Sequence, residues 1–258
     1  FFWRTSLNLL VDIGNTSIKF SSFVDNKIKK ISQIKYLKKD LRSVIIFFKN
    51  KLKTHTKIYV CSVVPEVDKI IIKNLKSYRN RLFFINKKKL SLLVHKTVNL
   101  RQLGNDRIIN VLSAINIYPK SKFFIIVDLG TATTLDIIIN KKYYGGVILP
   151  GLTTSYENLI SLASGIKNMK FSSKSSIIGK NTNQALMSGF NVGYKIMIES
   201  YIKLIKTTYK KNFKVIFTGG YATSIDYKKT NFIYREDLTL LGIFFYHIFL
   251  NEKLRIIK

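Results

Sequence analysis

The chain has 258 residues, of which 47% are hydrophobic and 22% are charged. This composition excludes a disordered chain and suffices for two domains of ordinary size. The formal charge of +30 is carried by lysines spread in short groups along the chain, together with frequent Ile and Asn. That pattern is typical of drift towards AT-rich codons, so we expect no specific nucleic-acid partner.

Cysteine, histidine and apolar residues exclude further classes of protein. Cys61 is the only cysteine, which excludes an internal disulfide and a cysteine-based zinc site, and its apolar neighbours favour a buried strand end over a reactive thiol. The three histidines lie far apart, without ligand spacing. Leu238–Leu250 is too short to cross a bilayer, and Phe1–Trp3 is not followed by a signal-type run. We therefore expect a cytoplasmic protein that contacts no membrane.

The first predicted element is a pair of strands joined by a tight turn. Leu9–Phe23 reads LLVDIGNTSIKFSSF: an apolar β-type run, then Asp-x-Gly-x-Thr, then a second run with β-branched or aromatic residues. Strand and helix patterns then alternate. In chain order we predict a strand over Lys57–Val64, a helix over Glu66–Tyr78, a strand over Arg81–Ile85 and a helix over Gly104–Ile117 that begins near Asn105.

The second half of the chain begins as the first half does. Ile125–Ile139 reads IIVDLGTATTLDIII, and its Asp128 lies 116 positions after Asp12 (128 − 12). The chain therefore looks like two copies of one α/β unit, and we predict domains over 1–117 and 118–258. The later elements are predicted to be a strand over Tyr144–Leu149, helices over Leu152–Ala163 and Gln184–Ile205, a strand over Lys214–Phe217 and a helix over Leu238–Leu250.

The turn at Asp12 has the groups that a phosphate site needs. Gly14 places no side chain between backbone N–H groups and an anion, and Asn15 and Thr16 add short donors. Asp12 can hold Mg²⁺ directly or through water. One such turn by itself is better explained as an ordinary hairpin. The matching turn at Asp128 favours the phosphate interpretation, because two turns on repeated units can clamp a polyphosphate from both sides of a cleft.

Paired Asp-x-Gly turns on duplicated units resemble the acetate and sugar kinase, Hsp70 and actin superfamily, and the sequence is similar to type III pantothenate kinases. The resemblance covers nearly the whole chain, in the family's order, through DIGNTSIK (12–19), SVVP (62–65), LGNDR (103–107), DLGTATTLD (128–136), GGVILPG (145–151), NTNQALMSG (181–189), TGG (218–220) and DLTLLG (237–242). It implies an α/β fold of two duplicated ribonuclease H-like (actin-like ATPase) domains that face a central nucleotide cleft. It also implies a homodimeric transferase that uses ATP to phosphorylate pantothenate to 4′-phosphopantothenate, the first step of coenzyme A biosynthesis.

The resemblance further implies roles for individual residues near the acceptor. Asp106 would be the catalytic base, for which positioning matters more than basicity when the phosphoryl transition state is loose. From spacing alone, Asp106 is a helix-start residue that helps to cap its helix, and the two roles are compatible. Arg107 would hold the pantothenate carboxylate or an amide carbonyl. Thr182 would contact substrate or serve as the N-cap of its helix. The expected substrate-binding set is Thr97, Gly104, Asn105, Asp106, Arg107 and Thr182.

The residues expected to bind the nucleotide lie in the two turns and in a later glycine pair. Lys19 either approaches the phosphates or is a solvated strand lysine, and Gly219-Gly220 would let the adenosine lie close to the backbone. The resemblance implies a monovalent cation, K⁺ or NH₄⁺, at Asp128 and Mg²⁺ that is held with ATP near Asp12. The expected ATP-binding set is Asp12, Ile13, Gly14, Asn15, Thr16, Ser17, Ile18, Lys19, Thr131, Gly219 and Gly220.

The chain departs from the family's pattern before LGNDR. The family usually has a tyrosine nine residues before the catalytic aspartate and a proline three positions later, where this chain has Thr97 and Leu100. Thr97 keeps a hydroxyl and loses the ring, which bears on pantothenate affinity and pocket shape. Two alternatives stay open: a kinase for another small alcohol, and a transcriptional accessory or nucleic-acid-binding protein on the same fold. The second alternative needs basic residues gathered on one face.

Overall fold

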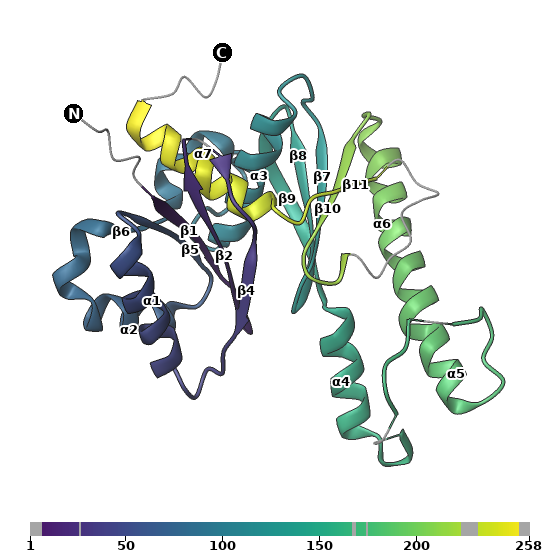
Figure 1. Cartoon of the computed structure of the whole chain (residues 1–258). Helices are drawn as coiled ribbons and strands as arrows, with labels where there is room; N and C mark the ends of the chain where they lie inside the picture. The colour runs from purple at the N-terminus through teal and green to yellow at the C-terminus, as the bar shows by residue number, and fades with distance from the viewer. Residues whose placement is uncertain (1–6, 26, 167–168, 174, 223–231, 253–258) are drawn as a thin grey trace. The chain divides into compact units, whose positions relative to one another are not determined.

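A computed structural model describes residues 7–25, 27–166, 169–173, 175–222 and 232–252 (Figure 1). The apolar Phe1–Trp3 lies outside them. The chain divides into two compact units: unit 1 comprises 1–120, 141–144 and 237–258, and unit 2 comprises 121–140 and 145–236. Across the described residues, none of the helices combines the length and the apolar character needed to span a membrane.

Unit 1 is built on one mixed sheet. Its strands follow the order β3-β2-β1-β5-β6, with β4 also paired to β2. β1 is antiparallel to β2 and parallel to β5, which is parallel to β6. The predicted strand pair over Leu9–Phe23 is thereby confirmed. The strands are β1 (Asn8–Ile13), β2 (Ser17–Val24), β3 (Lys27–Ile28), β4 (Ser32–Lys35), β5 (Ile58–Ser62) and β6 (Leu82–Phe84).

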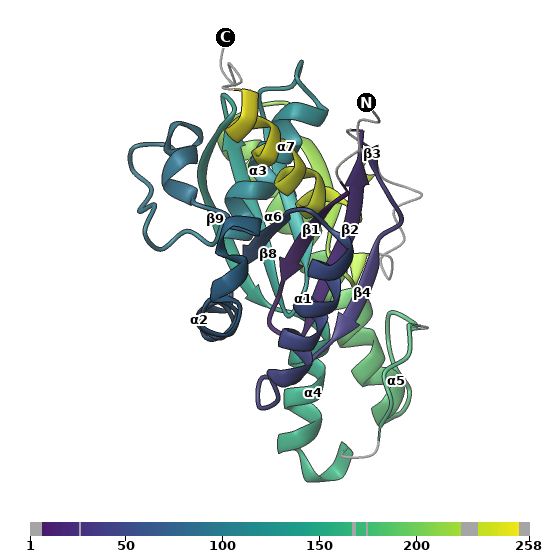
Figure 2. The ribbon, with the colours of Figure 1, turned by 60° about the vertical axis from the view of Figure 1, so that its left-hand side comes forward.

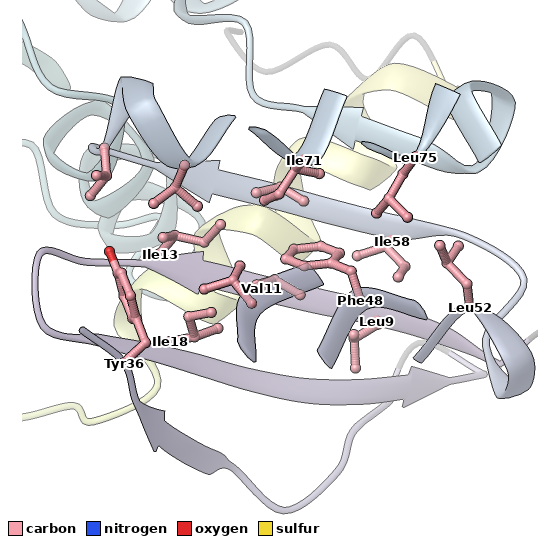
Figure 3. Close-up of a cluster of buried hydrophobic side chains, with 14 residues drawn as sticks. Leu9, Val11, Ile13, Ile18, Tyr36, Phe48, Leu52, Ile58, Ile71 and Leu75 are labelled. Carbon is pink, nitrogen blue, oxygen red and sulfur yellow. The ribbon is translucent and has the colours of Figure 1, made fainter. Parts of the chain in front are cut away.

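Helices cover both faces of the unit 1 sheet. Alternate residues of β1 point to one face, where Val11 and Ile13 pack against Phe48 of α1 (Arg42–Thr54) and Ile71 of α2 (Pro65–Asn74), as Figure 3 shows. On the other face lie α3 (Asn105–Ile117) and α7 (Leu238–Glu252), which run side by side in Figures 1 and 2. The predicted second domain, 118–258, thus differs from unit 2 at its end, because α7 packs on α3, β1 and β5.

Unit 2 carries a second sheet with strands in the order β11-β10-β7-β8-β9. The long helix α6 covers one face, where its Ile198 and Ile202 pack against Ile125 and Val127 of β7. The first three residues of β9 are grouped with unit 1. The elements are β7 (Phe124–Leu129), β8 (Ala132–Ile139), β9 (Lys142–Pro150), α4 (Leu152–Leu162), α5 (Thr182–Met187), α6 (Tyr194–Tyr209), β10 (Lys214–Thr218) and β11 (Ile233–Tyr234).

The two sheets repeat one topology. In each, a central strand pairs with an antiparallel neighbour on one side and with two successive parallel strands on the other: β2-β1-β5-β6 in unit 1 and β8-β7-β10-β11 in unit 2. β1 and β7 also share their burial pattern, in which only the fifth residue is partly exposed. Those fifth residues are Asp12 and Asp128. The predicted duplication of one α/β unit is therefore confirmed.

Two predicted helices differ from the structure. Gln184–Ile205 was predicted as one helix, but α5 and α6 are separated by a π-helical segment, Ser188–Gly193. Glycines at both the second and last positions of this segment weaken the ordinary α-helical turn there. The helix predicted over Glu66–Tyr78 ends at Asn74 and continues as a 3₁₀ turn.

Candidate active site

The first Asp-x-Gly turn joins β1 to β2 in unit 1. Because Val11 and Ile13 face α1 and α2, Asp12 points to the opposite face, which α3 and α7 cover. Lys19 is the direct cross-strand partner of Asp12, so its side chain lies on the same face. Ile13 and Ile18 are completely buried in the core. Of the predicted ATP-binding residues, these two can therefore reach a ligand only through their backbone.

Neighbouring polar groups fix the tip of this turn. The Gly14 N–H donates to the Ser17 carbonyl at 3.0 Å, and the Tyr36 hydroxyl donates to the Gly14 carbonyl at 2.7 Å. Burial raises the pKa of Tyr36, which keeps this donor protonated. Lys38 Nζ donates to Asn15 Oδ1 at 2.8 Å and brings a positive charge beside the exposed end of the turn. Sequence reasoning missed both Tyr36 and Lys38.

Neither glycine of the two turns is required by the protein's own packing. A Cβ on Gly14 would meet no described atom closer than 3.6 Å, and one on Gly130 none closer than 3.5 Å. Both distances are ordinary contacts, and neither residue has a positive φ angle. The turns themselves therefore do not need glycine, which agrees with the expectation that glycine leaves the backbone N–H groups open to an anion.

The predicted catalytic base lies in the first turn of α3. One carboxylate oxygen of Asp106 accepts the Arg107 N–H at 2.7 Å, so Asp106 helps to cap its own helix as its spacing alone predicted. A Cβ on Gly104 would lie 2.5 Å from that oxygen, and glycine thus leaves room for the carboxylate. Burial raises the pKa of Asp106, while the adjacent Arg107 opposes the shift. A raised pKa makes this carboxylate a stronger base.

Asp12 and the start of α3 both adjoin the end of β5. The Cys61 thiol is completely buried on β5, directly opposite Asp12 in the parallel register. Burial is the largest of the causes that raise the pKa of this thiol, and the negative charges of Asp12, Asp106 and Asp68 raise it further. The predicted buried strand end at Cys61 is confirmed, and the thiol stays neutral. Asn105 of α3 also donates to the Ser62 carbonyl, so the first turn and the helix that carries the predicted base adjoin the same strand end within unit 1. Asp68 of α2 is a third carboxylate whose charge acts there, and sequence reasoning missed it.

Three hydrogen bonds hold LGNDR and the loop before it in place. Asn105 Nδ2 donates to the Ser62 carbonyl at 3.2 Å, which ties the start of α3 to the end of β5. Lys87 Nζ donates to the Leu103 carbonyl at 2.5 Å and to the Arg101 carbonyl at 2.8 Å. The conformation of this loop is therefore set by SVVP on one side and by a lysine of a 3₁₀ segment on the other.

The predicted acceptor residues Arg107 and Thr97 are both connected to the start of β9. The Arg107 guanidinium lies 5.5 Å from the centre of the buried Tyr143 ring, within the range of a cation–π interaction. Thr97 is exposed, and its hydroxyl lies 2.9 Å from His95 Nδ1. The His95 N–H donates to the Tyr143 carbonyl at 2.9 Å, and its ring lies 4.6 Å from that of Tyr144. Tyr143 and Tyr144 were not predicted as site residues.

The second turn lies in unit 2, between β7 and β8. Its Thr131 and Ala132 are exposed. Gly219 follows β10 with a φ of +92°, and a Cβ there would lie 2.5 Å from Leu129 N and 2.6 Å from Asp128 Oδ1. Glycine is therefore required at 219, which packs directly against this turn. Gly220 has open space around its Cα.

Thr182 is the exposed first residue of α5. Asn181 caps this helix, because its side chain accepts the Gln184 N–H at 2.9 Å. The alternative reading of Thr182 as the N-cap is therefore wrong by one residue. No hydrogen bond recorded among the described residues joins Thr182 to the second turn, so its role as a substrate contact stays a prediction.

The carboxylates of the two turns suit a metal that arrives with its ligand. Within the described part of the chain, no group of three or more His, Cys, Asp or Glu side chains could hold a metal ion. Mg²⁺ bound to a nucleotide needs only one or two carboxylates, because phosphate oxygens and water complete its shell. Asp12 and Asp128 are each partly exposed at a strand end, which fits that requirement and does not fit a dedicated metal cage.

Comparisons with known proteins agree with these observations. The family model for type III pantothenate kinase matches residues 8–204. A type III pantothenate kinase of Pelagibacter ubique (strain HTCC1062) is 36% identical over 241 residues, which cover 90% of this chain and 95% of that protein. A crystal structure of a conserved putative Baf family transcriptional activator from Campylobacter jejuni matches with a TM-score of 0.63 and 25% identity, over 95% of this chain and 100% of that one.

A putative sugar kinase from Cytophaga hutchinsonii matches with a TM-score of 0.51 and 16% identity, over 94% of this chain and 99% of that one. At this identity the match shows the fold alone, and it agrees with the duplicated α/β architecture. The family model and the Pelagibacter relative each cover most of the chain, and the residues matched by the family model include both Asp-x-Gly turns and LGNDR. The chain belongs to the type III pantothenate kinase family.

Proposed function

We propose that this protein transfers the γ-phosphoryl group of ATP to the primary hydroxyl of pantothenate and releases 4′-phosphopantothenate and ADP. Family membership supports the reaction. The observation that carries the site assignment is geometric: Asp12 pairs with Cys61 in the strand register, and Asn105, the residue before Asp106, donates to the carbonyl of Ser62 at the end of β5. The proposed phosphate-binding turn and the proposed base are thereby held in one unit.

Asp106 is the base in this proposal. As the acceptor oxygen bonds to the γ-phosphorus, the bond to the bridging oxygen of ADP breaks and the hydroxyl proton passes to the Asp106 carboxylate. Because burial raises the pKa of Asp106, it accepts this proton more readily than an exposed aspartate would. Arg107, one residue along α3, holds the carboxylate or an amide carbonyl of pantothenate, a task that suits a planar guanidinium.

The proposal extends to cations and assembly. Kinases of this family use ATP with a divalent metal, which neutralises charge on the phosphates. Asp12 would hold Mg²⁺ with the nucleotide, and Asp128 would hold K⁺ or NH₄⁺. We further propose a cytoplasmic homodimer.

A direct assay tests the proposed reaction. The full chain, incubated with pantothenate, ATP, Mg²⁺ and K⁺, should yield 4′-phosphopantothenate, detected by mass spectrometry. Asp106→Ala should abolish turnover without changing the circular dichroism spectrum. Glu66→Ala, which removes an exposed acid from the first turn of α2, is the matched control and should keep turnover. A wild-type protein that forms no product over a wide range of cation and substrate concentrations would refute the proposal.

The same assay tests the alternative that the protein phosphorylates another small alcohol, and the curated relatives bear on the accessory-protein alternative. A panel of small alcohols, run beside pantothenate, shows whether Thr97 in place of the family's usual tyrosine accompanies another acceptor. The accessory-protein alternative is not favoured, because the curated relatives that match nearly the whole chain are named type III pantothenate kinases.

A further inference from the structure

The GGVILPG segment ends at Gly151, directly before α4, and the function proposed above gives it no task. In the structure, the start of α4 is bonded to the second turn. The carbonyl of Thr131 accepts two hydrogen bonds from it: one from the Gly151 N–H at 3.1 Å and one from the Thr154 hydroxyl at 2.8 Å. Thr154 thus uses its side chain to hold a backbone group of the turn.

Sterics show that this contact is a close fit. A Cβ on Gly151 would lie 2.3 Å from the Gly130 carbonyl oxygen and 2.4 Å from the Thr131 carbonyl oxygen. Both are backbone atoms, so the neighbours cannot yield by turning a side chain. Glycine at 151 is therefore what lets α4 begin against the turn.

The hydrogen bonds on Thr131 also orient the next peptide group. The described peptide bonds are trans, so the carbonyl of Thr131 and the N–H of Ala132 point in opposite directions across one plane. A carbonyl held against α4 directs the Ala132 N–H away from α4. Thr131 and Ala132 are both exposed, which places this turn at the surface of unit 2.

A second set of hydrogen bonds joins the end of β9 to the start of β8. The Tyr194 hydroxyl, at the start of α6, hydrogen-bonds the buried Thr133 hydroxyl and donates to the Pro150 carbonyl at 3.1 Å. The end of β9 and the start of β8 are therefore connected twice, through α4 and through α6. Backbone donors that are held rigidly before binding lose less entropy when an anion binds them.

We propose that the first turn of α4, through Gly151 and Thr154, positions the second turn for the phosphates of ATP, with the Ala132 N–H as a phosphate donor. Thr154 is a positioning residue that acts through the Thr131 carbonyl and does not touch the nucleotide. The inference rests on the proposed function only in taking ATP as the ligand of this turn.

The test compares three variants in the full chain. Thr154→Val removes the hydroxyl at nearly constant volume, Thr154→Ser keeps it, and Thr153→Val makes the same deletion one residue earlier as the matched control. Affinities for the non-hydrolysable analogue AMPPNP with Mg²⁺ and for adenosine are measured by calorimetry. Thr154→Val should weaken AMPPNP binding about three- to tenfold, as expected for one lost hydrogen bond, and should leave adenosine binding unchanged. The other two variants should match the wild type.

Kinetics give a second readout. In Thr154→Val the KM for ATP should rise by the same factor, while the KM for pantothenate stays constant. AMPPNP affinity equal to that of the wild type would overturn the inference, and so would an equal loss for adenosine, which indicates general loosening. A wild type that binds AMPPNP but does not phosphorylate pantothenate would refute the proposed function, and the binding data would still decide this inference. A wild type that binds no AMPPNP would overturn both.

Discussion

Replacing Gly242 by alanine tests whether the close approach of α7 holds the end of α3 that carries the proposed base, Asp106. A Cβ at this position would lie 2.2 Å from the Ile109 carbonyl oxygen and 2.5 Å from Ile109 Cγ2, so α7 would have to withdraw by about 1 Å to reach ordinary contact. Overpacking of this kind costs about 1–3 kcal/mol, and the better helix propensity of alanine offsets up to about 1 kcal/mol. Because the closest atom is a backbone oxygen that cannot turn aside, the cost lies in the upper part of this range, and we expect a net loss of about 1–2 kcal/mol in the free energy of unfolding.

The same substitution should reduce activity beyond its effect on stability. Ile109 lies within one turn of Asp106, and a displacement of about 1 Å at a catalytic group can cost about 100-fold in rate. Thermal unfolding should show a Tm lower by about 2–8 °C, and kcat should fall at a temperature where the variant is fully folded.

Gly193→Ala is the matched control for this experiment. Gly193 also has helical backbone angles, and a Cβ there would meet open space, so this variant should be as stable as the wild type or more so. If Gly242→Ala behaves as Gly193→Ala does, the reasoning about the α3–α7 contact is refuted. If it loses stability while kcat is unchanged, the link from this contact to Asp106 is refuted.

Three further predictions follow from the site. Asp106→Asn should abolish turnover yet raise the free energy of unfolding at neutral pH, because burial raises the pKa of Asp106 and its ionised form opposes folding. Urea unfolding should show no gain below about pH 4, the ordinary pKa of an aspartate, and a gain that grows as the pH rises from there through the raised pKa. Tyr143→Leu should raise the KM for pantothenate about 2- to 30-fold through loss of the ring against Arg107, whereas Tyr143→Phe should restore it, and equal values for both variants would contradict the role of the ring. Cys61, fully buried with a raised pKa, should react with a thiol reagent only in denaturant, and rapid reaction of the native protein would contradict its placement.

The sequence predicted best where a local pattern also determines the structure. The duplicated strand–turn–strand is readable because both strands are apolar and the Asp-x-Gly turn recurs at the same place. The helix that begins at Asn105 was found because its apolar positions follow helical spacing. Helix α1 was missed even though Val44, Phe48 and Leu52 form a buried stripe. It lacks a side-chain cap and any acidic residue in its first turn, so the usual start signals are absent.

The supports of the site could not be predicted, because they join segments far apart in the chain. Tyr143 meets Arg107, and Thr154 meets Thr131, through residue types that are common in any strand or helix. Asp68 could not be predicted as a site residue either, because an acid in the first turn of a helix is explained by the helix dipole alone. Only the fold shows that its charge acts at the end of β5.

The two turns share a sequence pattern, but different segments of the chain hold each of them in place. Each aspartate occupies the fifth position of its strand, so the repeated strands alone account for its placement. The first turn is fixed by the Tyr36 hydroxyl on the Gly14 carbonyl, from a segment that precedes α1. The second is fixed by α4 and by Gly219, which follow β9 and β10. The repeated strands therefore place the two proposed phosphate-binding turns, whereas segments outside the repeated strands hold each turn in place. If both turns bind the nucleotide as proposed, substitutions at the two sets of supports should act independently on nucleotide binding.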